Sequence, residues 1–463
     1  MFIQQIYTNC LAHAAYYIES GKEAAVIDPL RDPEPYIKLA HERGATIKYV
    51  LETHFHADFV SGHIDLANKT GATIVFGPDA NPGYKAYIAD DNEKLKLGSA
   101  HIQILHTPGH TIESTCYLLL NEKDEKTAVF TGDTLFIGDV GRPDLLSGNL
   151  QKEELAAMLY NSLQTKIKTL PDEVIVYPGH GAGSACGKNI SSESQSTIGE
   201  QRARNYAMIA ADKEAFIQAV TSDLPVIPAY FFKDAVINKK GCLPFDEVMK
   251  NNLRPLTLNE FKAIKNDGAL VLDTRDPMEF AAGFVKGALN VGLNGDFAVW
   301  VGTLIDTDAR MILVTAPGKE KEAVERLARI GYERVDGYLD GGMTNWFAEK
   351  LPYDNIMTFD STECETLLQT EDYNLLDVRN RMEVAKNRMA GSVHIPLNIM
   401  KSKYSTLEKD VKWLIYCAGG YRSMIAASYL RSKGFHFVGS IEGGIKEVIA
   451  KSPQLVETEM EQQ

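Results

Sequence analysis

The sequence predicts a multidomain protein of the α/β and α+β classes, in which an N-terminal α+β part precedes two small α/β domains. Its 463 residues are too many for one ordinary hydrophobic core, so we expect two to four domains. Short apolar runs alternate with turns and helices in the first part. The remaining chain contains an internal repeat in which each copy has the pattern strand, helix, strand, helix.

The bulk composition excludes several classes of function. The chain is 44% hydrophobic and 24% charged, as is typical of globular proteins, and its net charge of -14 argues against nucleic-acid binding. No apolar run approaches the roughly 20 residues that span a bilayer, and the N-terminus lacks the pattern of a signal peptide. Six cysteines show neither C-x-x-C spacing nor the density of a secreted scaffold. We therefore expect a cytoplasmic protein with reduced thiols and neither nucleic-acid nor membrane partners.

The first part carries a series of β-branched apolar runs that we expect to form buried strands. These runs are residues 24–27, 47–51, 73–76, 101–106, 116–120, 127–131 and 174–177. Asp32 followed by Pro33 predicts the start of a helix, because proline suits the first helical position. Residues 193–220 are largely polar and are predicted to be helical. They close a first domain at 1–252, and residues 253–257 are predicted to be a linker.

The internal repeat defines the other two domains. Residues 272–294 align without gaps on residues 376–398, at a constant offset of 104 (376 − 272). Further along, a Gly-Gly pair at 341–342 matches a second pair at 443–444, at an offset of 102. We expect two α/β domains with parallel sheets, at residues 253–352 and 356–460.

Side chains that bind metals follow four of the predicted strands, so the strand ends would bring them to one edge of a sheet. They are His54, His110, Asp133 and His180. The turns around them are rich in glycine and proline, as expected for loops that present side chains. We therefore interpret them as a metal site rather than as core histidines.

Two ligand sets are compatible with the spacing. In the first, His54, His110 and Asp133 form the facial triad of a non-haem ferrous iron, with open positions for dioxygen and substrate. In the second, His54, His56 and His110 hold a zinc ion that activates water for hydrolysis. The two sets overlap, so spacing alone leaves both open.

In the first interpretation, the iron site, three further polar side chains lie near the metal without binding it. They orient the ligands or exchange protons. These side chains are His56, Asp58 and His180.

The order of these residues resembles the ligand layout of the metallo-β-lactamase fold, an αββα sandwich. Dinuclear members of that fold place a second histidine directly after the aspartate that corresponds to Asp58. Here that position is Phe59, which cannot bind a metal. The resemblance therefore implies a site for a single metal.

Two longer stretches carry a more specific resemblance. Residues 130–145 (FTGDTLFIGDVGRPDL) resemble the signature of persulfide dioxygenases with this fold, and residues 177–188 (YPGHGAGSACGK) resemble the subgroup fused to rhodanese domains. This resemblance implies one Fe(II) per chain, held by His54, His110 and Asp133. The implied reaction oxidises the outer sulfur of a low-molecular-weight thiol persulfide with O2, giving sulfite and the free thiol.

Two residues in these stretches are candidates for further roles. Arg142 is a candidate for steadying an anionic substrate or product by charge-assisted hydrogen bonds, and a structural salt bridge under the loop is the alternative. Cys186 lies six residues after His180 in a glycine-rich turn. It is a candidate for carrying sulfur at the site, and a small buried filler is the alternative.

The last domain contains a loop suited to sulfur transfer. A strand at 413–416 leads into Cys417-Ala-Gly-Gly-Tyr-Arg422, and an apolar helix follows. Backbone N–H groups and the positive end of the helix would stabilise a thiolate or persulfide on Cys417. Arg422 can close the loop and hold an anion such as sulfite or thiosulfate. The pattern resembles the active loop of rhodanese sulfurtransferases.

The first copy of the repeat lacks this chemistry. Thr315 replaces Cys417, and Glu320 replaces Arg422. A threonine hydroxyl cannot take up transferable sulfur, and the glutamate reverses the charge where an anion would bind. We therefore predict that the middle domain is catalytically inactive, with a packing, docking or dimerisation role.

Together these features favour a sulfide-detoxifying enzyme that couples persulfide oxidation to sulfur transfer, giving thiosulfate. Coenzyme A, glutathione or a similar thiol would carry the persulfide, and the resemblance implies a homo-oligomer. The alternative is a zinc-dependent thioester hydrolase of the glyoxalase II type with accessory rhodanese domains. A non-enzymatic sulfur-binding or regulatory module is the third possibility, which the complete metal set and the intact Cys417 loop disfavour.

Overall fold

A computed structural model of the chain describes residues 1–145, 150–224, 226–370 and 373–458. The chain forms two compact units. The first comprises Met1–Val248 and Ala328–Gly331, and the second comprises Met249–Leu327 and Tyr332–Gln463. The last residues of the predicted third domain, 459–460, lie outside the described residues. Among the described helices, none has the length and apolar composition that a membrane span requires.

The first unit contains two six-stranded sheets. The first sheet has the order β1-β2-β3-β4-β5-β6, and the second has the order β12-β11-β10-β9-β8-β7. The strands of the first sheet are β1 (Phe2–Thr8), β2 (His13–Ser20), β3 (Glu23–Ile27), β4 (Thr46–Leu51), β5 (Thr73–Phe76) and β6 (Tyr87–Ile88). Those of the second are β7 (Lys94–Leu97), β8 (Ala100–His106), β9 (Thr115–Leu120), β10 (Lys126–Gly132), β11 (Ile175–Pro178) and β12 (Ser196–Thr197). All seven predicted strands are confirmed.

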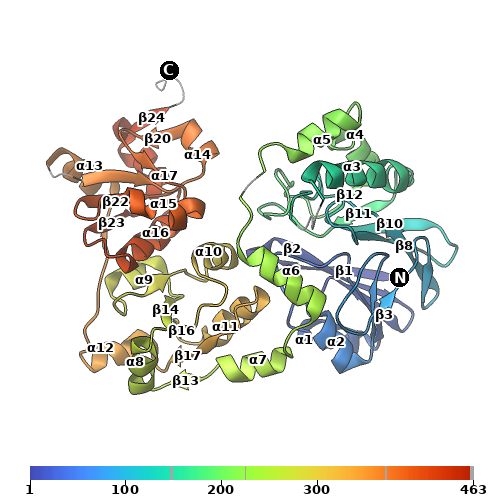
Figure 1. Cartoon of the computed structure of the whole chain (residues 1–463), viewed down its shortest axis with the longest axis horizontal. Coiled ribbons are helices and arrows are strands. Elements are labelled where there is room, and N and C mark those ends of the chain that lie inside the picture. The colour runs from blue at the N-terminus through green and yellow to red at the C-terminus, as the bar shows by residue number, and fades with distance from the viewer. Residues whose placement is uncertain (146–149, 225, 371–372, 459–463) are drawn as a thin grey trace. The chain divides into compact units, whose positions relative to one another are not determined.

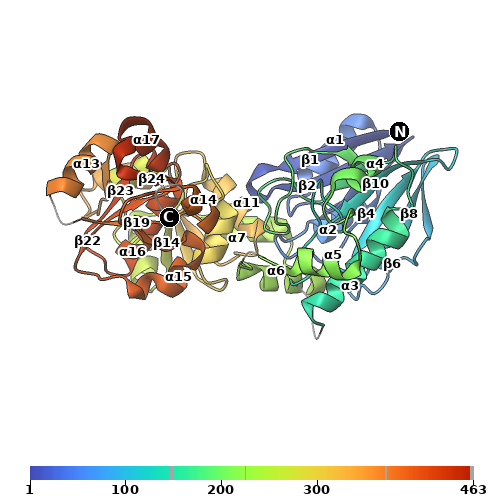
Figure 2. The same ribbon diagram turned by 90° about the horizontal axis from the view of Figure 1, so that it is seen from above.

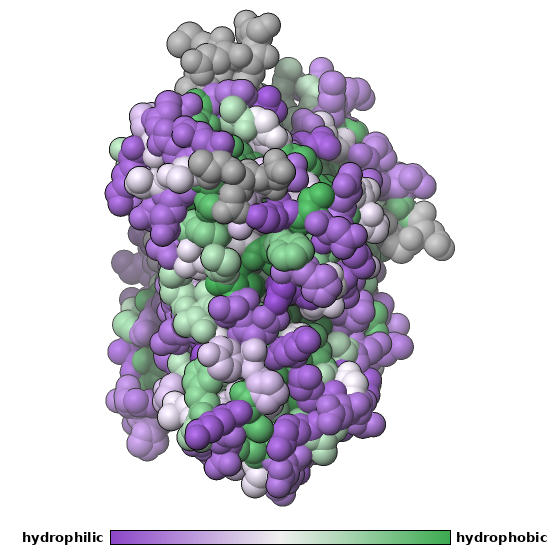
Figure 3. All heavy atoms as spheres, turned by 90° about the vertical axis from the view of Figure 1, so that its left-hand side faces the viewer, coloured by the Kyte–Doolittle hydropathy of each residue, from purple (hydrophilic) through white to green (hydrophobic). Residues whose placement is uncertain are grey.

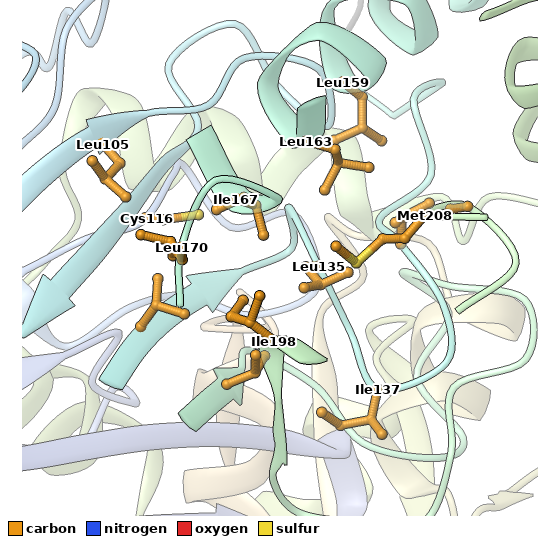
Figure 4. Close-up of a cluster of buried hydrophobic side chains, with 14 of the residues drawn as sticks. Leu105, Cys116, Leu135, Ile137, Leu159, Leu163, Ile167, Leu170, Ile198 and Met208 are labelled. Atoms are coloured by element: carbon orange, nitrogen blue, oxygen red, sulfur yellow. The ribbon is translucent and has the colours of Figure 1, made fainter. Parts of the chain in front are cut away.

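The alternation of side chains along β9 shows how the second sheet is buried on both faces. Successive side chains of a strand point to opposite faces. Tyr117 and Leu119 belong to the core between the two sheets. Cys116 and Leu118 belong to a second core, which Figure 4 shows between this sheet and its helices. A strand buried on both faces appears in the sequence as a continuous apolar run, which makes it recognisable.

Helices cover the outer face of each sheet (Figures 1 and 2). Those that pack on the first sheet are α1 (Glu34–Arg43) and α2 (His63–Thr70). Those that pack on the second are α3 (Lys152–Ser162), α4 (Ile198–Arg204) and α5 (Lys213–Thr221). Helices α6 (Tyr230–Lys240) and α7 (Phe245–Asn252) follow. The predicted αββα sandwich is therefore confirmed, and α1 begins directly after Pro33 as predicted.

The helical prediction for residues 193–220 is confirmed in part. The segment begins with the short strand β12 and then forms two helices, α4 and α5. Asn205 ends α4, where its side chain donates hydrogen bonds to the carbonyl groups of Phe136 and Asp139. Asp212 starts α5 by accepting a hydrogen bond from the N–H of Ala215. A local pattern of polar residues does not reveal these long-range bonds to the loop after β10.

The second unit contains two five-stranded parallel sheets with the same strand order, so the internal repeat is a repeat of topology. The first, β13-β17-β16-β14-β15, has strands β13 (Pro255–Leu256), β14 (Leu270–Asp273), β15 (Leu289–Asn290), β16 (Met311–Val314) and β17 (Val335–Leu339). The second, β18-β23-β22-β19-β21, has strands β18 (Met357–Phe359), β19 (Tyr373–Asp377), β21 (Val393–His394), β22 (Lys412–Tyr416) and β23 (Val438–Ile441). A small sheet pairs β20 (Asn387–Met389) with β24 (Val456–Thr458).

Helices follow these strands in both copies, as in other parallel sheets. In the first copy they are α8 (Leu258–Asn266), α9 (Pro277–Ala282), α10 (Phe297–Leu304), α11 (Glu320–Arg329) and α12 (Gly342–Ala348). In the second they are α13 (Ser361–Thr370), α14 (Arg381–Lys386), α15 (Met400–Lys403), α16 (Tyr421–Ser432) and α17 (Gly444–Lys451). The face of this unit seen in Figure 3 is mostly hydrophilic, with hydrophobic side chains in small groups.

The predicted linker at 253–257 is wrong in its centre, because Pro255–Leu256 forms strand β13. This strand pairs in parallel with β17, at Tyr338 and Leu339. Proline is tolerated at the start of an edge strand because it needs no N–H there. The pairing partner lies some 80 residues away, so the short segment carries no local signal of a strand.

Candidate metal centre and sulfur-transfer loop

The loops after β4, β8 and β10 bring three predicted ligands together. The ring nitrogen Nε2 of His54 lies 4.0 Å from Oδ2 of Asp133, and Nε2 of His110 lies 3.4 Å from the same oxygen. One ligand atom from each of the three residues lies within 4.8 Å of the others, and all three side chains are buried. The structure therefore brings together the residues of the first ligand set, and the ring of His56, from the second set, also lies beside that of His54, with their centroids 4.2 Å apart.

The hydrogen bonds around the two histidines fix which ring nitrogen is free. His110 Nδ1 lies 2.8 Å from the carbonyl oxygen of Arg142, which can only accept, so Nδ1 carries the proton. The Thr53 hydroxyl donates to Oδ2 of Asp28 at 2.8 Å, so it accepts from Nδ1 of His54 at 2.9 Å. Both histidines therefore present a lone pair on Nε2 toward Asp133, the orientation that such hydrogen bonds give to metal-binding histidines.

The charges of the triad also fit a cation. Burial lowers the pKa of His110 to about 4 and that of His54 well below its usual range, so both rings are neutral. Burial raises the pKa of Asp133 well above its usual range. Neither carboxylate oxygen of Asp133 has a hydrogen-bond partner within the described chain. A buried carboxylate without a partner is costly, and a metal cation bound here would compensate its charge.

His56 belongs to a different group. Its Nε2 lies 3.1 Å from Oδ1 of Asp28 and 3.5 Å from Oε2 of Glu52, and its Nδ1 has no hydrogen-bond partner among the described residues. These three residues form a second buried group of potential donors beside the triad. Sequence reasoning missed Asp28 and Glu52. Each directly follows one of the predicted strands, and this position, which the candidate metal ligands share, could have identified them.

The aromatic ring of Phe59 fills the space beside these histidines. It is fully buried, with its centroid 4.2 Å from that of His13 and 4.4 Å from that of His56. Phe59 thus contributes packing and no donor atom to the centre.

The other predicted pocket residues lie on the far side of Asp133. Nε2 of His180 lies 3.6 Å from Oδ1 of Asp133 and 3.4 Å from Oδ2 of Asp58. Cys186 is buried, and one ligand atom each from Asp58, His180 and Cys186 lies within 4.8 Å of the others. A cavity of about 420 Å³ lies next to His180 and is also lined by Gln5 and Tyr7.

Arg142 adopts the salt bridge that the sequence left as the alternative. Its guanidinium group makes two bonds to the carboxylate of Asp144, at 2.7 and 2.9 Å, and a third to the carbonyl oxygen of Ala185. Its backbone carbonyl orients His110, and its N–H donates to the carbonyl oxygen of Cys186 at 3.0 Å. Arg142 therefore ties the ligand loop to the Cys186 turn, and its contact with an anionic substrate stays a prediction.

Gly109 gives His110 the space to reach the centre. Its φ is +148°, and a Cβ at this position would lie 2.3 Å from the Cα of Leu159 in helix α3. We predict that Gly109→Ala lowers the free energy of unfolding by about 1–3 kcal/mol or more. The added methyl group overpacks this position, so either helix α3 or the loop that carries His110 must move. Thermal unfolding and the metal content of the variant would measure this effect.

Gly183 provides the matched control for that substitution. It also has a positive φ, +98°, but nothing lies within 4 Å of the position that a Cβ would take there. Gly183→Ala should therefore keep the metal content of the unmodified protein. Equal losses in both variants would show that backbone strain, rather than the contact with α3, causes the effect.

The Cys417 loop lies between β22 and α16, as predicted. The N–H of Gly420 points to Sγ of Cys417 at 3.1 Å, and Gly420 has the left-handed φ of +96° that this turn requires. The thiol is buried at the start of an α-helix, where N–H groups favour a negative charge. Arg422 makes two bonds to the carboxylate of Glu383, at 2.7 and 2.8 Å, and so closes the loop against α14.

The equivalent loop of the middle domain holds its own carboxylate. Thr315 follows β16, and the N–H of Gly318 donates to Oε1 of Glu320 at 3.2 Å. The carboxylate of Glu320 thus accepts a hydrogen bond from a backbone N–H of this loop. This arrangement supports the prediction that the middle domain does not bind an anionic sulfur substrate.

The middle domain nevertheless contributes to the surroundings of the Cys417 loop. The hydroxyl of Tyr421 donates to the carbonyl oxygen of Gly292 at 2.7 Å. A cavity of about 370 Å³ beside the loop is lined by Gly419 and Gly420 from the last domain and by Met278 and Asn294 from the middle domain. Sequence reasoning missed these contacts because the repeat aligns the two copies but does not show how they pack.

Comparisons with known proteins match both parts of the chain. Residues 8–180 match the family model described as Metallo-beta-lactamase superfamily, and residues 257–349 and 360–451 match the Rhodanese-like domain. The probable hydroxyacylglutathione hydrolase glo2 of Schizosaccharomyces pombe is 34% identical over 35% of this chain and 60% of its own length. The chain thus spans about three fifths of the length of this curated relative.

Solved structures include longer matches. A metallo-beta-lactamase from Staphylococcus aureus is 32% identical, with a TM-score of 0.65 over 73% of this chain and 98% of that chain. The ETHE1 protein from Myxococcus xanthus is 29% identical, with a TM-score of 0.44 over 52% of this chain and 98% of that chain.

Proposed function

The chain belongs to the metallo-β-lactamase superfamily and carries two rhodanese-like domains, and from this architecture we propose that it oxidises thiol persulfides and transfers their sulfur. The overall oxidation is RSSH + O2 + H2O → RSH + SO3²⁻ + 2H⁺. The Cys417 thiolate takes the outer sulfur of a second persulfide molecule and releases RS⁻. Sulfite then attacks the outer sulfur of the Cys417 persulfide, giving thiosulfate and the Cys417 thiolate. The carrier RSH is coenzyme A, glutathione or a similar thiol.

One observation carries the proposal. Nε2 of His54 and Nε2 of His110 face the same oxygen of Asp133, and hydrogen bonds fix both rings so that these nitrogens are free. Two neutral imidazoles and one carboxylate are the donor set of non-haem ferrous oxygenases. A ferrous ion held by these residues would supply open positions where O2 and the persulfide sulfur meet.

The chain's own residues position the reactants. The cavity of about 420 Å³ beside His180 has space for a small thiol or for part of a larger carrier, and Nε2 of His180 lies 3.6 Å from Oδ1 of Asp133. Cys186 lies beside Asp58 and His180 and interacts with the carboxylate of Asp133, so its thiol can accept or hold sulfur as the substrate is turned over. In the last domain, the N–H of Gly420 stabilises negative charge on the Cys417 sulfur.

A second candidate function is a zinc-dependent thioester hydrolase of the glyoxalase II type with accessory rhodanese domains. The name of the curated relative, hydroxyacylglutathione hydrolase, favours it. This function would use His54, His56 and His110 as ligands. The association of His56 Nε2 with Asp28 and Glu52 does not by itself prevent Nδ1 from binding a metal.

Oxygen uptake separates the two candidates. We expect the protein loaded with ferrous iron to consume O2 when given coenzyme A persulfide or glutathione persulfide, with one sulfite formed for each O2. We expect no appreciable hydrolysis of a hydroxyacyl-glutathione thioester by the same preparation. Thioester hydrolysis without persulfide-dependent O2 uptake would overturn the proposal in favour of the hydrolase.

A further inference from the structure

The middle domain keeps the shape of the sulfur-transfer loop but not its charges. Gly318 and Gly420 are equivalent at the offset of 102 (420 − 318), and both have a left-handed φ, +77° and +96°. In the last domain, Arg422 makes two bonds to the carboxylate of Glu383, at 2.7 and 2.8 Å. The middle domain has Glu320 at the position of this arginine. Its loop has therefore lost the guanidinium group that its counterpart holds.

The glutamate that would bind such a group is still present. At the offset of 104 (383 − 279), Glu279 corresponds to Glu383, and in both copies its backbone carbonyl oxygen accepts a bond from an arginine, at 3.4 and 3.5 Å. The carboxylate of Glu279 has no hydrogen bond or ion pair among the described residues. Glu279 and Glu320 both line a cavity of about 350 Å³. Two carboxylates thus line a space where the last domain has one carboxylate and one guanidinium group.

A buried hydroxyl group in the same cavity points to a ligand rather than to a merely acidic surface. Thr315, at the position of Cys417, is only 4% exposed and lines this cavity together with the two glutamates. Its hydroxyl has no hydrogen-bond partner within the part of the chain that the structure describes, and its oxygen keeps some accessible surface, so it is open to the cavity. A buried hydroxyl without a partner costs free energy, which a bound donor would recover.

Arg275 also lines the cavity, but its charge is already compensated. Its guanidinium group lies 2.7 Å from Oδ2 and 2.9 Å from Oδ1 of Asp273. The equivalent pair of the last domain, Arg379 and Asp377, makes the same contacts, at 2.6 and 3.0 Å. That pair lies in the domain whose glutamate binds a guanidinium group. The Arg275 pair is therefore compatible with a cation on the neighbouring glutamate.

We propose that this cavity of the middle domain binds a ligand with a guanidinium group on an aliphatic stem, as in an arginine side chain or a free guanidino compound. The planar fork of the ligand donates two parallel bonds to Glu279, and its remaining N–H groups reach Glu320 and Thr315. Met343 and Phe347 line the cavity too, so they offer apolar surface to the stem and an aromatic face to the cation. The catalytically inactive domain is then a binding module, and this role is independent of the proposed function.

Isothermal titration calorimetry of the full-length protein with N-acetylarginine methylamide tests the site directly. We expect about one molecule bound per chain, because one guanidinium group satisfies both carboxylates. N-acetyllysine methylamide carries the same charge but no planar fork, so it should bind at least about 10-fold more weakly. Agmatine, which has no polypeptide backbone, is the third probe. Binding of agmatine alone would assign the site to a free guanidino compound, and binding of both guanidinium probes would show that an arginine residue also fits.

Glu320→Arg provides the sharpest variant, because it supplies the guanidinium group from within the chain. The new side chain stands where Arg422 stands in the last domain, so it should pair with Glu279 and abolish binding of every probe.

Two milder variants serve if Glu320→Arg does not fold. Glu279→Gln keeps the shape of an exposed side chain and should weaken binding at least about 10-fold, and Thr315→Val should weaken it about 10-fold by removing one hydrogen bond to a charged group. Glu349→Gln is the control, because Glu349 is exposed in the same domain and does not line the cavity, so this variant should bind normally. Absence of binding to the unmodified protein, unchanged binding in Glu279→Gln, or an equal loss in Glu349→Gln would overturn the inference. The titrations need neither a metal nor turnover, so they are independent of whether the protein oxidises persulfides.

Discussion

Replacing Asp133 with asparagine is expected to remove the catalytic metal and to reduce persulfide-dependent O2 uptake more than about 100-fold. This loss would exceed the loss of about 10- to 100-fold that is typical when a residue that only orients a metal ligand is replaced. The substitution removes the negative charge and leaves one oxygen where two now face separate donor groups. It also removes a buried carboxylate that has no hydrogen-bond partner in the described chain, so the metal-free protein should keep its melting temperature. Iron analysis, an oxygen electrode and thermal unfolding measure the three effects.

Asp65→Asn is the control for this substitution. Asp65 is also buried, and burial raises its pKa too, but it accepts a hydrogen bond from the N–H of Phe245 and belongs to no donor group of the described residues. The control should retain iron and O2 uptake. An Asp133→Asn protein with normal iron content would contradict the assignment of the triad.

Replacing Cys417 with serine is expected to reduce sulfur transfer by at least about 1000-fold, as for the loss of other catalytic nucleophiles. The serine hydroxyl fits the loop and can accept the Gly420 N–H, but it cannot carry a transferable sulfur atom. Persulfide-dependent O2 uptake should be unchanged, because that reaction uses the first unit. Thiosulfate formation and O2 uptake are measured on the same preparation.

Cys364→Ala provides the comparison in the same domain. Cys364 is buried in the hydrophobic core of that domain, and burial raises the pKa of its thiol to about 12, so it is not a nucleophile. This variant should transfer sulfur normally. Full sulfurtransferase activity in Cys417→Ser would show that another residue carries the sulfur.

Much of the fold was predictable from the sequence because the decisive signals are local. Strands such as β9 are buried on both faces and therefore appear as continuous apolar runs. The repeat predicted two similar domains, and their identical strand order confirms it. The candidate ligands His110 and Asp133 were recognisable because each follows a predicted strand in a turn that contains glycine.

The features that the sequence did not show depend on contacts between distant segments. Strand β13 exists because Pro255 and Leu256 pair with a strand about 80 residues away. The hydrogen bond from Arg142 to the carbonyl oxygen of Ala185 became visible only once the two loops were placed together, whereas the salt bridge of Arg142 with Asp144 is local. The approach of Cys186 to Asp58 also depends on distant segments, because Asp58 comes from the loop after β4 and Cys186 from the loop after β11.

Anomalous scattering from crystals of the active protein, recorded at the iron and zinc absorption edges, would locate the catalytic metal itself. We expect one iron atom within bonding distance of Nε2 of His54, Nε2 of His110 and Oδ2 of Asp133. No iron should lie on the Cys186 side of that carboxylate. Zinc in place of iron at the triad, or iron atoms on both sides of Asp133, would be incompatible with a single oxygen-activating iron.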